Sequence, residues 1–156
     1  MTTLWERAES MEAHAAISAA VAKRFSADGD DGACGWATNM WAADWDGNRL
    51  YLEHLTEAAD AGDIACMCLG AAIRLECAKY FGVHIADTGG LANEVCRSYC
   101  AVGGIAPEWD EGMPVGVGRP YLNAIIEWND AAGRPVSQIA DLVQRTAADC
   151  EARAGQ

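Results

Sequence analysis

The longest apolar stretch of the chain covers residues 64–81 and contains only three charged side chains. A helix that is apolar around most of its circumference belongs in the interior of a fold. Asp63 precedes the stretch as a suitable N-cap, and Gly82 follows it, where helices commonly end in a left-handed residue. The pattern therefore predicts a central, buried helix over residues 64–81, around which the other segments pack.

Apolar residues three and four positions apart predict further helices on both sides of this one. Thr3 and Glu6 have the spacing of a capping box. Gly103 and Gly104 form a helix stop, and Pro120 suits the first position of a helix. The helices are expected over residues 4–25, 91–102, 120–129 and 136–153, with a short helical turn over 54–61 and loops over 26–35 and 105–118.

Residues 36–52 follow a different periodicity. Apolar positions alternate on both sides of residues 46–48, whose sequence Asp-Gly-Asn favours a tight turn. Alternation on both sides of such a turn is typical of a β-hairpin. The sequence therefore predicts a small β-hairpin near residues 40–52.

Together these elements predict a mainly α (α+β) fold. A chain of 156 residues is long enough for one sizeable core and too short for two. We therefore expect a single domain over residues 1–156, organised as a helical bundle around the central apolar helix with one small β-hairpin.

Gly70 lies inside the predicted central helix, where glycine is about 1 kcal/mol less favourable than alanine. Its presence predicts that another part of the backbone packs closely against it. We expect this neighbour to be the last helix, through Ala140 or Ala147, because small residues on both helices permit a close approach.

The chain is acidic: 23 Asp and Glu residues against 11 Lys and Arg residues give a net charge of -12. Such a chain repels phosphate backbones and anionic membranes at long range. The first ten residues do not have the pattern of a signal or transit peptide, and the longest uncharged apolar run, 64–73, is about half of the roughly 20 residues that a membrane span needs. We expect a cytoplasmic protein whose partner is a host protein with a basic surface or a small ligand, with no nucleic-acid or membrane partner.

Seven cysteines are distributed mostly within the predicted helices. Their odd number and positions favour free, buried thiols in a reducing compartment, with at most Cys34 and one other exposed. The alternative is a zinc site: Cys96 and Cys100 are one helical turn apart, and His84 or Cys77 would complete it. We favour packed thiols without a metal, because no Cys-x-x-Cys knuckle is present.

Asp87, Thr88 and Gly89 form the tripeptide that aspartic proteases use in pairs. Those enzymes are built of β-strands, whereas this tripeptide lies between two predicted helices. We interpret Asp87 or Thr88 as a helix cap.

Asp44, Asp46 and Asn48 match the first three ligand positions of a calcium loop. The sixth position is Arg49 instead of glycine, and the twelfth is Leu55 instead of glutamate. A hairpin turn explains the three residues without a metal.

Residues 123–145 loosely match a helix-turn-helix. The expected recognition helix over 137–144 carries Asp141 and no lysine or arginine. Because contacts to phosphate need cations, we favour a helical hairpin that only packs.

No catalytic arrangement is indicated. The three histidines, at positions 14, 54 and 84, lie in separate segments, and neither a nucleophile elbow nor a phosphate loop is present. We therefore predict a non-enzymatic protein that uses no cofactor.

Six tryptophans stand against only two phenylalanines. Tryptophan is common at binding surfaces, although it fills an alanine-rich core equally well. We expect the hairpin tryptophans and the corner at 128–130 to form the contact surface. Asn129 and Asp130 would either stabilise the turn or point into a cleft formed with the hairpin. The predicted binding residues are Trp36, Trp41, Asp44, Trp45, Arg74, Trp128, Asn129 and Asp130.

Three segments together resemble a family of small uncharacterised proteins from actinobacteria and their phages. They are GWATNMWAADWDGN at 35–48, CMCLGAA at 66–72 and WNDAAGRPVSQIADLV at 128–143. Pro135 stands where this family usually has threonine before the last helix, and the middle region of the family is shorter. The resemblance implies a domain of unknown function that mobile elements sometimes carry, and it implies no catalytic residues.

These observations favour a non-enzymatic cytoplasmic binding protein, an accessory factor of a phage or mobile element that acts on a host protein. One alternative is a protein that sequesters a small, nucleotide-type ligand, with Arg49, Arg74, Arg97 and Arg119 forming a positive pocket. A further alternative is a regulatory protein that is stabilised by zinc or contains a helix-turn-helix.

Overall fold

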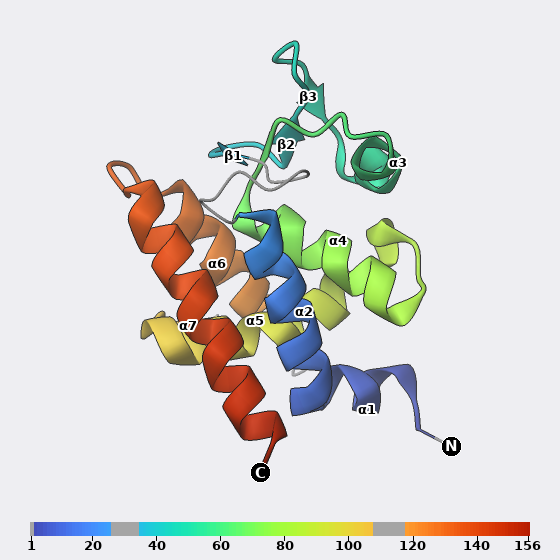
Figure 1. Cartoon of the computed structure of the whole chain (residues 1–156), viewed down its shortest axis with the longest axis vertical. Helices are drawn as coiled ribbons and strands as arrows, with labels where there is room; N and C mark the ends of the chain where they lie inside the picture. The colour runs from blue at the N-terminus through green and yellow to red at the C-terminus, as the bar shows by residue number, and fades with distance from the viewer. Residues whose placement is uncertain (1, 26–34, 108–117) are drawn as a thin grey trace.

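The computed structural model describes residues 2–25, 35–107 and 118–156, in which α-helices pack beneath a small sheet (Figure 1). The helices are α1 (Leu4–Glu9), α2 (Met11–Arg24), α3 (Leu55–Asp60), α4 (Leu69–Phe81), α5 (Gly89–Gly103), α6 (Pro120–Asp130) and α7 (Val136–Ala154). Two short 3-10 helices, η1 (Leu52–His54) and η2 (Ile85–Asp87), precede α3 and α5. The predicted mainly α fold with a small β element is confirmed.

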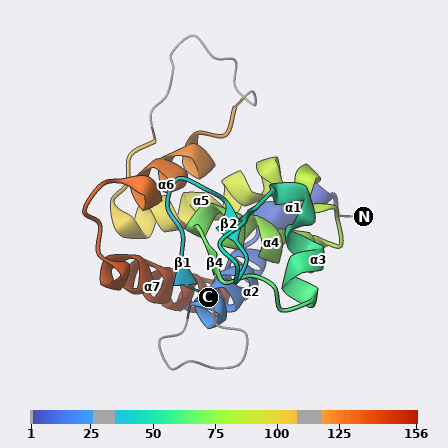
Figure 2. The same ribbon diagram turned by 90° about the horizontal axis from the view of Figure 1, so that it is seen from above.

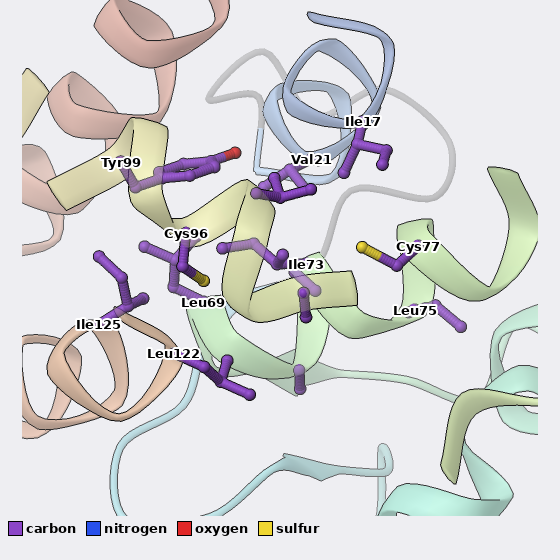
Figure 3. Packing of buried hydrophobic residues seen from close by; sticks show 14 of the residues in the cluster. Ile17, Val21, Leu69, Ile73, Leu75, Cys77, Cys96, Tyr99, Leu122 and Ile125 are labelled. Atoms are coloured by element: carbon purple, nitrogen blue, oxygen red, sulfur yellow. The ribbon is translucent and has the colours of Figure 1, made fainter. Parts of the chain in front are cut away.

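Helix α4 lies at the centre of the bundle, with α2, α5 and α6 packed around it (Figures 1 and 2). Eleven of its 13 residues are buried. Figure 3 shows the reason: Leu69 and Ile73 lie in a cluster with apolar side chains of the neighbouring helices α2, α5 and α6. An ion pair between Arg24 and Glu76 also joins α2 to α4. The central helix predicted from the apolar stretch is therefore confirmed.

The predicted start of this helix is wrong by five residues. Cys66 and Met67 form strand β4 instead, and the helix begins at Leu69 after Cys68, whose Sγ accepts a hydrogen bond from the backbone N–H of Ala71 at 3.3 Å. Asp63 is not its N-cap, because it follows α3. Periodicity cannot separate a short buried strand from a buried helix when every position is apolar.

The sheet has four strands in the order β1-β4-β2-β3: β1 (Gly35–Trp36), β2 (Ala42–Ala43), β3 (Arg49–Leu50) and β4 (Cys66–Met67). β2 and β3 are antiparallel, with Ala42 opposite Leu50, so the predicted hairpin is confirmed. β4 lies between β2 and β1 and is parallel to β1. β1 and β4 could not be predicted, because a strand of two residues is too short to show an alternation of apolar and polar positions.

The predicted helix over residues 4–25 is two helices. Thr3 and Glu6 form the expected capping box at the start of α1. The helix ends at Glu9, because Ser10 adopts an extended conformation and its side chain accepts from the backbone N–H of Ala13, which starts α2. Ser10 thus acts as an N-cap in the middle of an unbroken apolar periodicity.

Gly70 is a point of close approach, as predicted, but the neighbour is a side chain and not a backbone, and it does not come from the expected helix. A Cβ atom at this position would lie 2.8 Å from Cγ1 of Ile126 in α6, with the ring of Trp41 at 3.7 Å. Helix α7 packs mainly against α2 instead. The sequence indicates that a neighbouring group packs closely against Gly70, but it does not show which helix supplies that group.

The remaining boundaries follow the sequence closely. Gly82 and Gly104 end α4 and α5 in the left-handed conformation, with φ of 67° and 64°. Pro120 begins α6 as expected. The expected loops at 26–35 and 105–118 fall largely outside the described residues. Within the described segments, no helix combines the length and apolar character of a membrane span.

Candidate binding site

An open cleft of about 560 Å³ lies beside the hairpin, between the sheet and the adjoining ends of α4 and α6. Trp41, Leu50, Tyr51 and Ile126 give it an apolar and aromatic wall, and Arg49 and Asp130 bring opposite charges to it. The full lining is Asn39, Met40, Trp41, Arg49, Leu50, Tyr51, Cys68, Ile126 and Asp130. We call this the hairpin cleft.

Asn129 and Asp130 hold the cleft in shape. The fully buried Asn129 accepts a hydrogen bond from the backbone N–H of Leu69 through Oδ1, at 3.1 Å, and donates through Nδ2 to the carbonyl of Ala37, at 2.9 Å. Oδ1 of Asp130 accepts from the backbone N–H of Asn39 at 2.9 Å and from Nδ2 of Asn129. These bonds fasten the end of α6 to the start of α4 and to the segment between β1 and β2.

Trp41 is fixed on its inner side. Its carbonyl accepts from the N–H of Cys68 at 2.9 Å, and the guanidinium of Arg74 lies 5.6 Å from the centre of its ring. Arg74 is itself buried, so it supports the cleft wall and does not line the cleft. Of the corner at 129–130, Asp130 lines the cleft together with Trp41, whereas Asn129 is buried behind it.

Asp44 and Trp45 stabilise the hairpin. The carboxylate of Asp44 accepts from the backbone N–H groups of Asp46 and Asn48 and from Nδ2 of Asn48. Hydrogen bonds from Asn48 are the main reason why the pKa of Asp44 is below its usual value. Trp45 is 70% exposed and donates from Nε1 to the carbonyl of Gly62. The interpretation of residues 44–48 as a turn is therefore confirmed.

Trp36 and Trp128 do not line the cleft. The ring of Trp36 stacks on Phe25, with 3.5 Å between centroids. Trp128 lies under the guanidinium of Arg134, which is 3.9 Å from its ring centre and donates to its carbonyl. The eight predicted residues therefore do not form one surface.

The four arginines of the small-ligand alternative lie in different surroundings. Arg49 lines the hairpin cleft, whereas Arg97 pairs with Glu94 and lies over the ring of Tyr121. Arg74 and Arg119 influence each other electrostatically. The expectation of one pocket formed by all four is wrong, because neither the hairpin cleft nor the hollow that Arg97 lines contains the other three.

The six described cysteines are free, and among them only Cys66 is partly exposed. Burial raises the pKa of Cys77 to about 12 and those of Cys68 and Cys100 to about 11. Cys96 is completely buried. No group of three His, Cys, Asp or Glu side chains able to hold a metal occurs in the described segments.

The histidine expected to complete the zinc site has another role. Nδ1 of His84 accepts from the backbone N–H of Ala86 at 3.1 Å, which caps η2. Thr88 is the residue before α5, as expected of a cap, but its hydroxyl does not bond to the helix end. It donates to the carbonyl of Ile85 and accepts from Nε of Arg74. The tripeptide 87–89 therefore has a structural explanation.

His14 and Ser98, which no sequence pattern brings together, are joined by a 2.7 Å hydrogen bond between α2 and α5. Nε2 of His14 contacts the carbonyl of Ala8 at 2.8 Å, and a carbonyl can only accept. Nδ1 is then the acceptor for the Ser98 hydroxyl. Because Ser98 lies inside α5, the surrounding N–H groups are used by the helix and cannot hold an oxyanion. The pair joins three helices and is not arranged for catalysis.

Tyr51, Ile126 and Cys68 are cleft residues that the sequence did not single out. Tyr51 had a usable signal, since it is two residues from Arg49 and residues two apart share a face of a hairpin strand. Ile126 and Cys68 had none, because their proximity depends on how α4 and α6 pack.

Comparison of the chain with protein-family models, with curated proteins and with solved structures gives no significant match in any of the three. The resemblance to the actinobacterial and phage proteins therefore stays a prediction.

Proposed function

We propose that this is a non-enzymatic cytoplasmic binding protein, an accessory factor of a phage or mobile element, whose hairpin cleft takes an extended, basic segment of a host protein. The observation that carries the proposal is the hairpin cleft itself. It combines the half-buried Trp41 and the exposed Tyr51 with a wall held by the hydrogen bonds of Asn129 and Asp130. The resemblance of the sequence to phage and actinobacterial proteins supports the biological setting.

An extended occupant is favoured because β3 is an edge strand of the sheet. The carbonyl of Ala43 accepts from Ala65 on the β4 side, so Ala42 is the residue of β2 that bonds toward β3. Ala42 is opposite Leu50. The backbone groups of the next residue, Arg49, therefore point to the open edge, where an added strand can pair with them.

A basic occupant is favoured by the charge of the outer wall. Residues 42–65, which form the hairpin, η1 and α3, contain the acidic residues 44, 46, 53, 57, 60 and 63 and only one arginine. Asp130 adds a carboxylate on the opposite wall. An arginine or lysine side chain entering the cleft meets this charge and the faces of Trp41 and Tyr51, with which cations interact favourably.

The proposal is tested with a fluorescently labelled library of extended peptides that contain arginine, lysine and single apolar residues, read by anisotropy. We expect saturable binding of some basic peptides and none of acidic peptides of the same length. Tyr51→Ala should weaken binding about tenfold or more, as expected for an aromatic residue at the centre of a contact. Tyr51 is 67% exposed, so its removal leaves the core intact.

Tyr80→Ala is the matched control, because Tyr80 is also an exposed tyrosine but lies on α4 outside the hairpin cleft. It should bind as the parent does. If both variants bind equally well, or if acidic and basic peptides do not differ, the hairpin cleft is not the contact site.

A further inference from the structure

A second hollow, of about 410 Å³, lies between the junction of α1 and α2, the middle of α5 and the last turns of α7 (Figure 1). It is separate from the hairpin cleft, because the two share no residue. Its lining residues are Glu9, Met11, His14, Glu94, Arg97, Ser98, Ala101 and Arg153. We call it the α5 hollow.

The floor of the α5 hollow consists of buried polar side chains. His14, Glu94 and Ser98 are only 2%, 6% and 6% exposed. Side chains that helices turn toward one another are normally apolar, and a carboxylate is almost never buried to this degree unless partners satisfy it. Three buried polar groups at the bottom of one hollow therefore indicate a place for a polar ligand.

The carboxylate of Glu94 is only partly satisfied. Its Oε1 accepts a hydrogen bond from Nη2 of Arg97 at 3.2 Å, and no described residue donates to its Oε2. The side chain of Glu94 is 8% exposed, whereas that of Arg97 is 56% exposed. One ion pair with a solvated partner offsets little of the cost of burying a carboxylate. A positively charged donor in the hollow would supply the missing partner.

Two further acceptors face the same hollow. Ser98 is one helical turn from Glu94, and its hydroxyl donates to Nδ1 of His14, so its oxygen can still accept. Glu9 is exposed and forms no ion pair within the described segments. His14 adds no positive charge, because burial lowers its pKa and the ring is neutral at pH 7. These three acceptors match the three N–H groups of an ammonium.

Two guanidinium groups lie at the rim of the hollow. Arg97 pairs with Glu94 through Nη2, and Arg153 pairs with Asp149 through Nε. The ring of Tyr121 covers a face of Arg97 and not its N–H edge. Each arginine therefore keeps N–H groups that can donate to a carboxylate. A ligand with both an ammonium and a carboxylate matches this arrangement, whereas a simple cation or a nucleotide matches only half of it.

We infer that the α5 hollow binds a free α-amino acid. Its ammonium group is held by Glu94, Glu9 and Ser98, and its carboxylate is held by the two arginines at the rim. Met11 and Ala101 give the side chain of the ligand an apolar surface to pack against. This site does not depend on the function proposed for the hairpin cleft.

The test is calorimetric titration of the full chain with each standard L-amino acid, followed by the N-acetyl derivative and the amide of the one that binds most tightly. We expect saturable binding of the free amino acid at one site and at least tenfold weaker binding of both derivatives, because each lacks one of the two charges. Glu9→Gln should weaken binding about tenfold, the effect of removing one charge-assisted contact. Because Glu9 is exposed, this variant should keep the fold.

Two further variants make the result decisive. Glu12→Gln is the matched control, because Glu12 is an exposed glutamate of α2 that does not line the hollow, and it should bind as the parent does. Glu94→Gln should weaken binding most, and if this buried change prevents folding, Glu9→Gln decides. The inference is overturned if no amino acid binds, if either derivative binds as tightly as the free amino acid, or if Glu9→Gln and Glu12→Gln have the same effect.

Discussion

Single buried polar side chains join segments that are far apart in the sequence. Asn129 connects the end of α6 to the start of α4 and to the segment after β1. His14 connects α2 with α5 through Ser98 and with α1 through Ala8. Each such group is satisfied by partners that no local pattern reveals. The sequence therefore predicts that Asn129 lies near the hairpin, but it does not predict which groups Asn129 bonds to.

His14 should make the stability of the protein depend on pH. Burial is the main cause that lowers its pKa below 6.5 in the folded state. As the pH falls below about 6.5, the unfolded chain binds a proton that the folded chain resists, so the free energy of unfolding decreases. The loss is at most about 1.4 kcal/mol per pH unit for one proton. Urea denaturation between pH 7 and pH 5 measures it.

His14→Gln should remove this slope, whatever it does to stability at pH 7. His54→Gln is the control, because His54 is exposed. An unchanged slope in His14→Gln would show that another group causes the pH dependence.

Asn129 should be more important for stability than for contact with a partner. Asn129→Asp keeps the acceptor for the N–H of Leu69 but places an oxygen against the carbonyl of Ala37 and the carboxylate of Asp130. Leaving buried polar groups unpaired costs about 1–3 kcal/mol each. Thermal denaturation should show a clear decrease in Tm for Asn129→Asp. If Asn129→Asp has the same Tm as the parent protein, these hydrogen bonds do not hold the hairpin cleft together.

At the scale of helices and strands, the sequence predicts where a helix begins and ends better than it predicts which other element packs against it. Gly82, Gly104 and Pro120 mark helix ends through local backbone geometry, and each is found where expected. Ser10 breaks a helix whose apolar spacing continues through it, and the start of α4 is displaced by a strand of two residues. Both departures come from hydrogen bonds that compete with an apolar pattern, and such competition is not visible in the pattern itself.

Gly70 tests how α4 and α6 pack. Gly70→Leu should destabilise the protein by about 1–3 kcal/mol, because the new side chain meets Ile126 across a gap already filled. Ile126→Ala should reduce this penalty, and a double-mutant cycle by chemical denaturation measures the coupling. If Ala140→Gly on α7 relieves the penalty and Ile126→Ala does not, the neighbour assigned to Gly70 is wrong.

At the scale of the whole molecule, the pattern of apolar residues predicts a mainly helical fold with one central helix, and this is what forms. The arrangement around that helix depends on long-range packing. Helix α7 packs mainly on α2, from which it is separated by most of the chain. The hairpin cleft could be predicted in part, since Trp41 and Asp130 both line it, but Trp36 stacks on Phe25 and Trp128 lies under Arg134.

Buried thiols should make the native protein slow to react with thiol reagents. Of the six described cysteines, five are buried, and burial raises the pKa of Cys68, Cys77 and Cys100 to about 11 or 12. A thiol reagent at pH 8 should therefore modify at most Cys34 and Cys66 quickly, and all seven cysteines after denaturation. Prompt modification of more than two cysteines in the native protein would contradict the burial of these thiols in the core. Zinc bound in equal amount and lost together with the fold on chelation would restore the metal alternative.

The most direct test of the central claim is a titration of isotope-labelled protein with the tightest basic peptide, followed by amide chemical shifts. If the hairpin cleft is the contact site, saturable shifts will concentrate at residues 39–41, 49–51, 68 and 126–130, and they will disappear in Tyr51→Ala but persist in Tyr80→Ala. Shifts spread evenly over the acidic surface, or the same response in both variants, would contradict the account.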